Sequence, residues 1–287
     1  SPLSSSSAAS DVYKRQKLER MSAFSSIESW PVDTVAGALL HRGEVVEQVG
    51  DASRRFSVAS VTKLVAAYGV MVAVEEGAVE LDQPAGPEGS TLRHLLAHTS
   101  GVGFDSREPQ KAVGERRIYS SAGYEWAAEV VEKATEIPFP EYLAEGVCAP
   151  LGMSATTLEG SAGHGLTSTV EDLVAFAREV QSPQLLDPST VAEMTRVQFP
   201  GLRGIVPGYG SFKDCTWGLG FEIHGEKGQW MGSLPSDAVG HFGMSGTFLW
   251  IAGEWAMVAL TDRDFGDWCK PLWAETNTAI WEECQSR

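Results

Sequence analysis

The amino-acid sequence predicts an α+β fold, with one antiparallel sheet formed from both chain ends and flanked by helices. Patterns typical of strands occur near the start of the chain and again in its last third, whereas helical patterns fill the middle. The connections between the end strands are short, which favours antiparallel pairing. We therefore expect a single domain over residues 21–287, with a helical subdomain at about residues 78–200 inserted between the strands.

The strands are predicted from apolar runs beside turn signals. Residues 34–40 and 44–49 form a hairpin whose turn contains Arg42 and Gly43. Further strands are predicted in the last third of the chain, after a loop rich in glycine and proline at about residues 200–210. They lie at residues 217–223, 247–251 and 255–260.

The most distinctive helix is predicted over residues 60–76. Residues 64–74 within it are apolar on every side, so this helix must be buried all round. Gly77 is placed to end it. Two further helices are expected at residues 91–101 and 121–135, with Thr91 and Ser121 as their N-caps. Another helix is expected to begin at a capping box at residues 168–171, and the last helix is expected at residues 272–284.

Composition and charge indicate an ordinary globular protein. Of the 287 residues, 43% are hydrophobic and 21% are charged, and 22 Lys and Arg against 38 Asp and Glu give a net charge of −16. An acidic chain is a poor partner for nucleic acid or an anionic membrane. The longest apolar run is far shorter than the roughly 20 residues that span a bilayer. We therefore expect neither nucleic-acid binding nor a membrane span.

The four cysteines and the start of the chain bear on its compartment. Cys148, Cys215, Cys269 and Cys284 form no C-x-x-C pair and are expected to be buried thiols in a reducing compartment. Residues 1–20 are serine-rich, and part of them back-translates readily to a transposon-end sequencing adapter, so we interpret them as a non-native or disordered tail. No signal-peptide core follows, which predicts a cytoplasmic protein.

Ser60 and Lys63 form the first candidate catalytic pair. Residues three apart on a helix share a face, so Lys63 can reach the Ser60 hydroxyl. Burial and the positive end of the helix dipole both lower a lysine pKa, and a neutral amine can accept the serine proton. The S-x-x-K spacing alone is weak, but here it opens the most apolar helix of the chain.

Four segments together resemble the group of class C β-lactamases, low-molecular-mass D-Ala-D-Ala peptidases and related esterases. The resemblance spans about residues 35–262 and implies the β-lactamase/transpeptidase-like fold. The segments, in the family's order, are FSVASVTK at residues 56–63, TLRHLLAHTSG at residues 91–101, YSSAGY at residues 119–124 and GHFG at residues 240–243.

The resemblance implies a role for each matching residue. Ser60 would be acylated and Lys63 would activate it. Tyr119, near two cationic groups, would have a lowered pKa and act as base or as acid toward the leaving group. Either Lys63 or Tyr119 could be the base. His241 would sit on a strand edge and tune Tyr119. The N–H groups of Ser60 and Met244 would form the oxyanion hole.

Two departures from the family pattern bear on the substrate. Ser121 stands where the family usually has Asn. Ser121 and Gly243, the latter from the third motif, are both expected to bind the substrate. His241 replaces the Lys of efficient β-lactamases and, near its reference pKa of about 6.5, would be only partly charged at neutral pH. We expect the rate to follow its titration.

These changes favour a serine hydrolase acting on a small ester, amide or peptide, with weak β-lactamase activity at most. The alternative is a catalytically impaired, penicillin-binding-like sensing protein. No cofactor is expected, and the oligomeric state is left open. His94 and His98 have the i, i+4 spacing of helical zinc pairs, but no zincin glutamate or third ligand accompanies them, so no metal site is expected.

Overall fold

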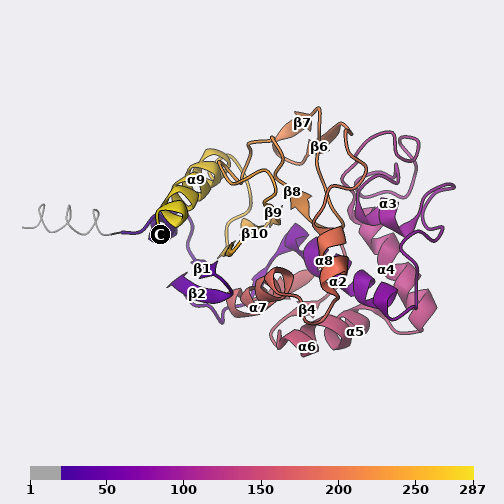
Figure 1. The fold of residues 1–287 in the computed structure, drawn as a ribbon, viewed down its shortest axis with the longest axis horizontal. Coiled ribbons are helices and arrows are strands. Elements are labelled where there is room, and N and C mark those ends of the chain that lie inside the picture. Colours follow the sequence, from indigo (N-terminus) through magenta and orange to yellow (C-terminus); the bar gives the residue numbers. More distant parts are fainter. Residues whose placement is uncertain (1–20) are drawn as a thin grey trace, which may run out of the picture.

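The computed structural model describes residues 21–287 and has the predicted α+β architecture (Figure 1). The predicted tail, residues 1–20, lies outside the described residues. A six-stranded sheet has the order β2-β1-β11-β10-β9-β8, and all its pairs are antiparallel. Its strands are β1 (Val35–His41), β2 (Glu44–Val49), β8 (Glu222–Ile223), β9 (Val239–Gly243), β10 (Thr247–Ala252) and β11 (Trp255–Thr261).

The two ends of the chain meet in the middle of this sheet, as predicted. Strand β1 pairs with β11 along its whole length, from Val35 opposite Thr261 to His41 opposite Trp255. Side chains alternate between the two faces. Leu249 and Ile251 of β10 therefore join the core on one face, and Phe248 and Trp250 join the core on the other.

Helices cover both faces of the sheet. Helix α9 (Lys270–Ser286) and a short 3-10 helix, η1 (Phe24–Ser29), contribute to the tryptophan-rich core on one face. Helices α2 (Thr62–Glu75) and α7 (Val170–Gln181) contribute to the larger core on the other face. Figure 1 shows α9 on one side of the sheet and α7 and α2 on the other. This two-sided cover explains why every residue of β10 and β11 is buried.

Helix α2 confirms the prediction of a helix buried all round. Twelve of its 14 residues are buried, including Lys63. Its first turn, however, is a 3-10 helix, η2 (Ala59–Val61), so the predicted α-helix begins two residues later than expected. Gly77, with φ of +75°, ends the helix region.

Several of the remaining elements, among them α4, α5 and η3, contact α2. The helices are α3 (Leu92–Leu96), α4 (Ser121–Thr135), α5 (Phe139–Leu143), the π-helix η3 (Ala144–Cys148), α6 (Ala149–Leu151) and α8 (Pro188–Met194). The small sheets contain β3 (Phe56–Ser57), β5 (Leu166–Ser168) and β4 (Thr157–Leu158), and the hairpin of β6 (Gly204–Val206) and β7 (Gly210–Phe212). The helical subdomain over residues 78–200 stays a prediction.

Four local predictions were wrong. The helix expected at residues 91–101 is the five-residue α3, which ends at Leu96. Ser120, not Ser121, caps α4, because its hydroxyl accepts from the N–H of Gly123. Thr169, not Ser168, caps α7. The strand expected at residues 217–223 shrinks to the two residues of β8. Gly220, with φ of +90°, breaks the extended backbone there, and a side chain at this position would strike Ala67 of α2.

All four cysteines are buried free thiols, as predicted. Within residues 21–287, none of the helices combines the length and the apolar character needed to cross a membrane.

A buried ion pair fixes the segment around β8. The Lys227 ammonium lies 3.5 Å from a Glu222 carboxylate oxygen, and both side chains are almost fully buried. Lys227 also donates to the carbonyl oxygens of Thr216 and Ile223, at 2.8 and 2.5 Å. Glu222 accepts from the indole N–H of Trp230 at 2.9 Å. Because each charge is hydrogen-bonded on several sides, the pair holds the segment as one unit.

Removing one member of this pair should therefore be costly. We expect Lys227→Met to lower the free energy of unfolding by about 3–5 kcal/mol, because Glu222 stays buried without its cation. The double variant Glu222→Gln/Lys227→Met should lose clearly less than the sum of the two single variants. Urea denaturation of the four proteins measures this, and a loss below about 1 kcal/mol for Lys227→Met would contradict the assignment.

Candidate active site

Ser60 lies on a strained turn at the entrance to α2. The preceding residue, Ala59, has φ of +43°, a left-handed conformation that non-glycine residues rarely adopt. The turn is held by hydroxyl donors from the β9–β10 connection. Ser245 donates to the carbonyl oxygen of Ser57 at 2.7 Å, and Thr247 donates to that of Val58 at 3.2 Å. The fold thus fixes the backbone on which the Ser60 hydroxyl stands.

Gly243 allows the end of β9 to approach this turn. A Cβ atom there would lie 2.4 Å from the carbonyl oxygen of Val58 and 3.1 Å from the Cβ of Ala59. Only glycine permits this approach. The approach brings the next residue, Met244, to the cavity that Ser60 also lines.

Lys63 lies one helical turn behind Ser60 and is fully buried. Its ammonium has three acceptors: Ser60 Oγ at 3.3 Å, Ser121 Oγ at 3.1 Å and the carbonyl oxygen of Gly163 at 2.8 Å. The amine also lies 4.5 Å from the centre of the Tyr119 ring. Burial lowers the pKa of Lys63 to about 7. Both protonation states are therefore populated at neutral pH, as the sequence predicted.

Tyr119 reaches the same place from a distant part of the chain. Its phenolic oxygen lies 3.4 Å from Nε2 of His241. The predicted lowering of its pKa was wrong. Burial raises the pKa of Tyr119, a hydrogen bond with Ser60 lowers it in part, and the charge of Glu222 raises it further. The phenol is therefore neutral.

His241 lies on β9, beyond the residues of β8 that pair with that strand. Its Nδ1 lies 2.6 Å from the carbonyl oxygen of Phe242, which can only accept, so Nδ1 carries the proton and Nε2 is free to accept from Tyr119. The expectation of a half-charged histidine was wrong. Burial lowers the pKa of His241 to about 3, and the nearby Lys63 charge contributes. The ring is neutral at physiological pH.

His98 supports Tyr119 from behind, a role that the sequence did not predict. Its carbonyl oxygen accepts from the N–H of Ile118 at 2.8 Å, and its Nδ1 accepts from the N–H of Ser120 at 3.0 Å. Its ring packs 4.7 Å from that of Tyr119. His98 thus holds the backbone on both sides of the phenol. Its location in the HTSG segment was the only signal.

Arg117 ties the loop rich in glycine and proline, predicted at about residues 200–210, to the site. The guanidinium is buried and donates to the carbonyl oxygens of four residues, at 2.5 to 3.1 Å. These residues are Ala97, Gln198, Phe199 and Cys215. The loop is therefore anchored at both ends beside the segment that carries Tyr119.

The hydroxyl of Ser60 faces a small cavity of about 40 Å³. Aromatic and other apolar side chains dominate its wall, and Pro207 comes from the loop rich in glycine and proline. Phe104 and Met244 are about half exposed at its edge. The lining residues are Ser60, Phe104, Tyr119, Pro207, Trp217, His241, Phe242 and Met244. The structure thus brings the residues of the predicted site together, while their chemical roles stay predictions.

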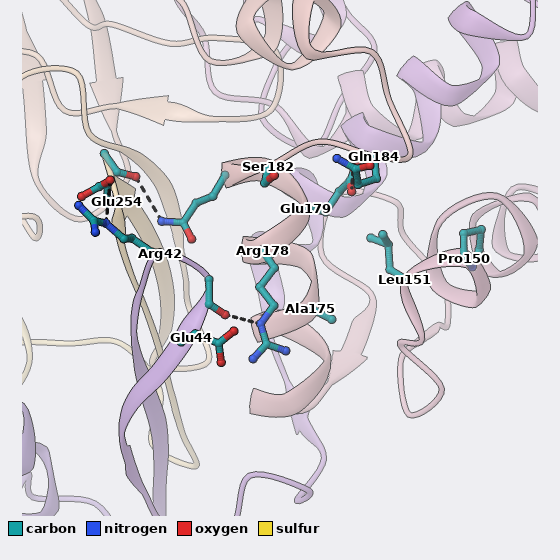
Figure 2. Close-up of a pocket in the computed structure, with 13 residues that line it drawn as sticks. Arg42, Glu44, Pro150, Leu151, Ala175, Arg178, Glu179, Ser182, Gln184 and Glu254 are labelled. Atoms are coloured by element: carbon teal, nitrogen blue, oxygen red, sulfur yellow. Dashed lines mark hydrogen bonds and ion pairs between the residues drawn. The ribbon is translucent and has the colours of Figure 1, made fainter.

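A larger pocket lies elsewhere, at the turns of β1–β2 and β10–β11 and along α7 (Figure 2). Its volume is about 740 Å³. An ion pair joins Arg42 to Glu254 at 2.9 Å, and Arg178 donates to the carbonyl oxygen of Gly43 at 2.5 Å. The wall contains no histidine or lysine beside its one serine, Ser182. Size alone therefore does not identify the site.

The two histidines considered as a zinc pair have other partners. His94 Nδ1 accepts from the N–H of Thr91 in the capping box of α3, and His98 bonds to Ser120. The part of the chain that the structure describes contains no cluster of three His, Cys, Asp or Glu side chains that could hold a metal ion.

The site and the fold place the chain among known proteins. The beta-lactamase family model matches residues 32–276. The chain belongs to the beta-lactamase family. A crystal structure of a beta-lactamase from Mycobacterium bovis is 46% identical over 91% of this chain and 99% of that one, with a TM-score of 0.90. The fold is therefore the β-lactamase/transpeptidase-like fold that the motifs implied.

Curated relatives match over shorter segments. Monacolin J acid methylbutanoyltransferase of Aspergillus terreus is 35% identical over 96 residues, which cover 24% of this chain and 23% of that protein. Penicillin-binding protein 4* of Bacillus subtilis is 28% identical over 134 residues, which cover 35% of this chain and 30% of that protein. The matches span less than a third of either relative, and the two relatives have different activities by name.

The neutral state of His241 can be tested directly. We expect its Cε1–H signal, assigned with His241→Asn, to show no titration between pH 5 and pH 8, because burial holds its pKa near 3. Two-dimensional NMR of histidine-labelled protein measures this. A midpoint near the reference value of about 6.5 would contradict the structure.

Proposed function

We propose that this protein is a serine acyl hydrolase that forms an acyl-enzyme on Ser60 and acts on a small, uncharged ester or amide. The observation that carries the proposal is the contact between Ser60 and Lys63. A buried amine with a pKa of about 7 lies 3.3 Å from a serine hydroxyl that lines a cavity. An amine of this kind can take the serine proton at neutral pH.

Acylation begins when the Ser60 oxygen bonds to the acyl carbon and its proton passes to the neutral amine of Lys63. The carbonyl oxygen becomes an oxyanion, and the N–H groups of Ser60 and Met244, which both line the cavity, would bind it. Of the two candidate bases, Lys63 fits better, because the pKa of Tyr119 is raised and its phenol keeps its proton.

Collapse of the intermediate breaks the bond to the leaving group and leaves the acyl group on Ser60. The leaving alkoxide or amine takes a proton from the Lys63 ammonium, or from the phenol of Tyr119, to which the Lys63 ammonium then returns a proton; by either route Lys63 ends as a neutral amine. His241 supports the second route, because its free Nε2 accepts from the phenol and orients it. A water molecule then attacks the acyl-enzyme, gives a proton to Lys63, and releases the acid as Ser60 regains its hydrogen.

The wall of the cavity supports an uncharged substrate. Its lining residues carry no lysine or arginine, and His241 is neutral. β-Lactams and peptides that end in D-Ala present a carboxylate, which such a wall cannot pair with a cation. The similar protein from Mycobacterium bovis is called a beta-lactamase. We infer that β-lactam hydrolysis here is at most a weak side activity.

The small volume also supports a short acyl group. A volume of about 40 Å³ is far below the roughly 300–1,000 Å³ typical of ligand pockets, so we expect Phe104 or Met244 to move when a substrate enters. Both are free to do so, being 52% and 48% exposed.

Substitution of the nucleophile tests the reaction class. We expect Ser60→Ala to lower the rate of p-nitrophenyl acetate hydrolysis at least about a thousandfold and to abolish labelling by a fluorophosphonate. Ser182→Ala, on the distant pocket, should keep both. Full activity in Ser60→Ala would contradict the proposal. A wild-type protein that neither hydrolyses esters nor labels would favour the alternative of an impaired, penicillin-binding-like sensing protein.

The substrate class can be tested with a panel of acyl chains. We expect kcat/KM for p-nitrophenyl esters to fall steeply from acetate to octanoate, and the rate with nitrocefin to be far lower than with acetate. Phe104→Ala should raise the octanoate rate relative to acetate about tenfold, because it widens the entrance. Ile205→Ala, an exposed apolar side chain outside the cavity lining, is the control. Unchanged chain-length preference in Phe104→Ala would contradict this assignment of the wall.

A further inference from the structure

A chain of three hydrogen bonds runs from Lys63 away from the cavity. The Lys63 ammonium donates to the carbonyl oxygen of Gly163 at 2.8 Å. The N–H of Gly163 donates to Ser161 Oγ at 3.0 Å, and that hydroxyl donates to the carboxylate of Glu125 at 2.5 Å. The direction of donation is consistent along the whole chain, since the carboxylate only accepts. A charged group on α4 is thus linked to the catalytic amine through one loop.

We propose that Glu125 and Ser161 are positioning residues that set the place and the proton affinity of Lys63, acting through the backbone of Gly163, whose N–H bonds to Ser161 and whose carbonyl oxygen accepts from Lys63. This inference rests on the proposed function, in which Lys63 is the base. It adds two residues that contact neither the cavity nor Ser60.

The packing of the loop that carries Gly163 explains why a short side chain, that of Ser121, fits beside Lys63. A Cβ atom at Gly163 would lie 2.8 Å from the Cβ of Ser121 and 2.9 Å from its Cα. The loop therefore sits directly on Ser121, and a longer side chain at position 121 would displace it. In this arrangement the Gly163 carbonyl supplies an acceptor for Lys63 beside the short Ser121 hydroxyl.

Hydrogen bonds within the loop that carries Gly163 close it into a turn, so a displacement of Ser161 should also displace Gly163. The N–H groups of His164 and Gly165 both donate to the carbonyl oxygen of Ser161, at 3.2 and 2.7 Å. The carbonyl oxygen of Ser161 thus holds the turn, and its hydroxyl holds the N–H of Gly163. Loss of the Ser161 hydroxyl should make the position of the Gly163 carbonyl, which accepts from Lys63, less fixed. It should leave the lining of the substrate cavity unchanged.

The charges around Lys63 favour Glu125 as the tuning group. Tyr119 and Tyr124 face the amine with neutral rings, and burial together with the Lys63 charge keeps the pKa values of His98 and His241 low. Burial lowers the pKa of Lys63, and the charge of Glu125 opposes that effect. On its outer side Glu125 faces Arg107, whose guanidinium is paired with Glu129 at 2.5 Å.

The matched variants are Glu125→Gln and Glu129→Gln. Both remove one carboxylate from the same helix one turn apart, but only Glu125 bonds to Ser161. We expect Glu125→Gln to lower the pKa of Lys63 by about half a unit or more, because the amide keeps an acceptor for Ser161 and loses the charge. Glu129→Gln should leave it unchanged. NMR titration of the Cε signal of Lys63 in lysine-labelled protein, assigned with Lys63→Arg, measures both.

Ser161→Ala tests the positioning half of the proposal. We expect the rate of Ser60 labelling by a fluorophosphonate to fall about tenfold, with KM for p-nitrophenyl acetate little changed and circular dichroism like that of wild type. Glu125→Asp, which keeps the charge, should retain the Lys63 pKa of the wild type more closely than Glu125→Gln.

Equal Lys63 titrations in Glu125→Gln and Glu129→Gln, or an unaltered labelling rate in Ser161→Ala, would overturn the proposal. If Glu125→Gln does not fold, Glu125→Asp and Ser161→Ala still decide it. The Lys63 titration is read without any substrate, so a protein without esterase activity would refute the proposed function and leave this test intact.

Discussion

The proposed chemistry of this protein depends on one buried contact, between the amine of Lys63 and the hydroxyl of Ser60. Helix α2 is buried on all sides, so a lysine in its first turn has no access to water and gives up its proton near pH 7. The rest of the architecture keeps that contact in place. The strained turn before Ser60 is held by the β9–β10 connection, and Gly243 lets that connection come close.

The groups around this contact are neutral, and this determines what the site can bind. Burial keeps Tyr119 protonated and His241 uncharged, so the two form a hydrogen-bonded pair without a net charge. The cavity wall adds apolar side chains and no cation. Membership of the beta-lactamase family gives the fold. The neutral wall is the observation that supports the proposed preference for a short acyl ester over a carboxylate-bearing β-lactam.

Much of this could be predicted from sequence, for physical reasons. The spacing of Ser60 and Lys63 is local, and a helix fixes the distance between them. Strand patterns at both ends of the chain predicted one shared sheet, but they did not predict that β1 pairs with β11. The pKa values of Tyr119 and His241 could not be predicted, because they depend on burial by residues far away in the chain. The same holds for Gly163 and Glu125, which reach Lys63 only through tertiary packing and belong to no motif.

The most direct test of the central contact is the pH dependence of Ser60 labelling by a fluorophosphonate, followed by intact-protein mass spectrometry. If neutral Lys63 is the base, the labelling rate constant should rise through a single ionisation near pH 7 and then stay level, since the amine is unprotonated above its pKa. In Lys63→Met, the rise of the labelling rate constant near pH 7 should disappear, and most of the labelling rate should be lost. A rate that grows with hydroxide concentration up to pH 9, with no level region, would contradict the account.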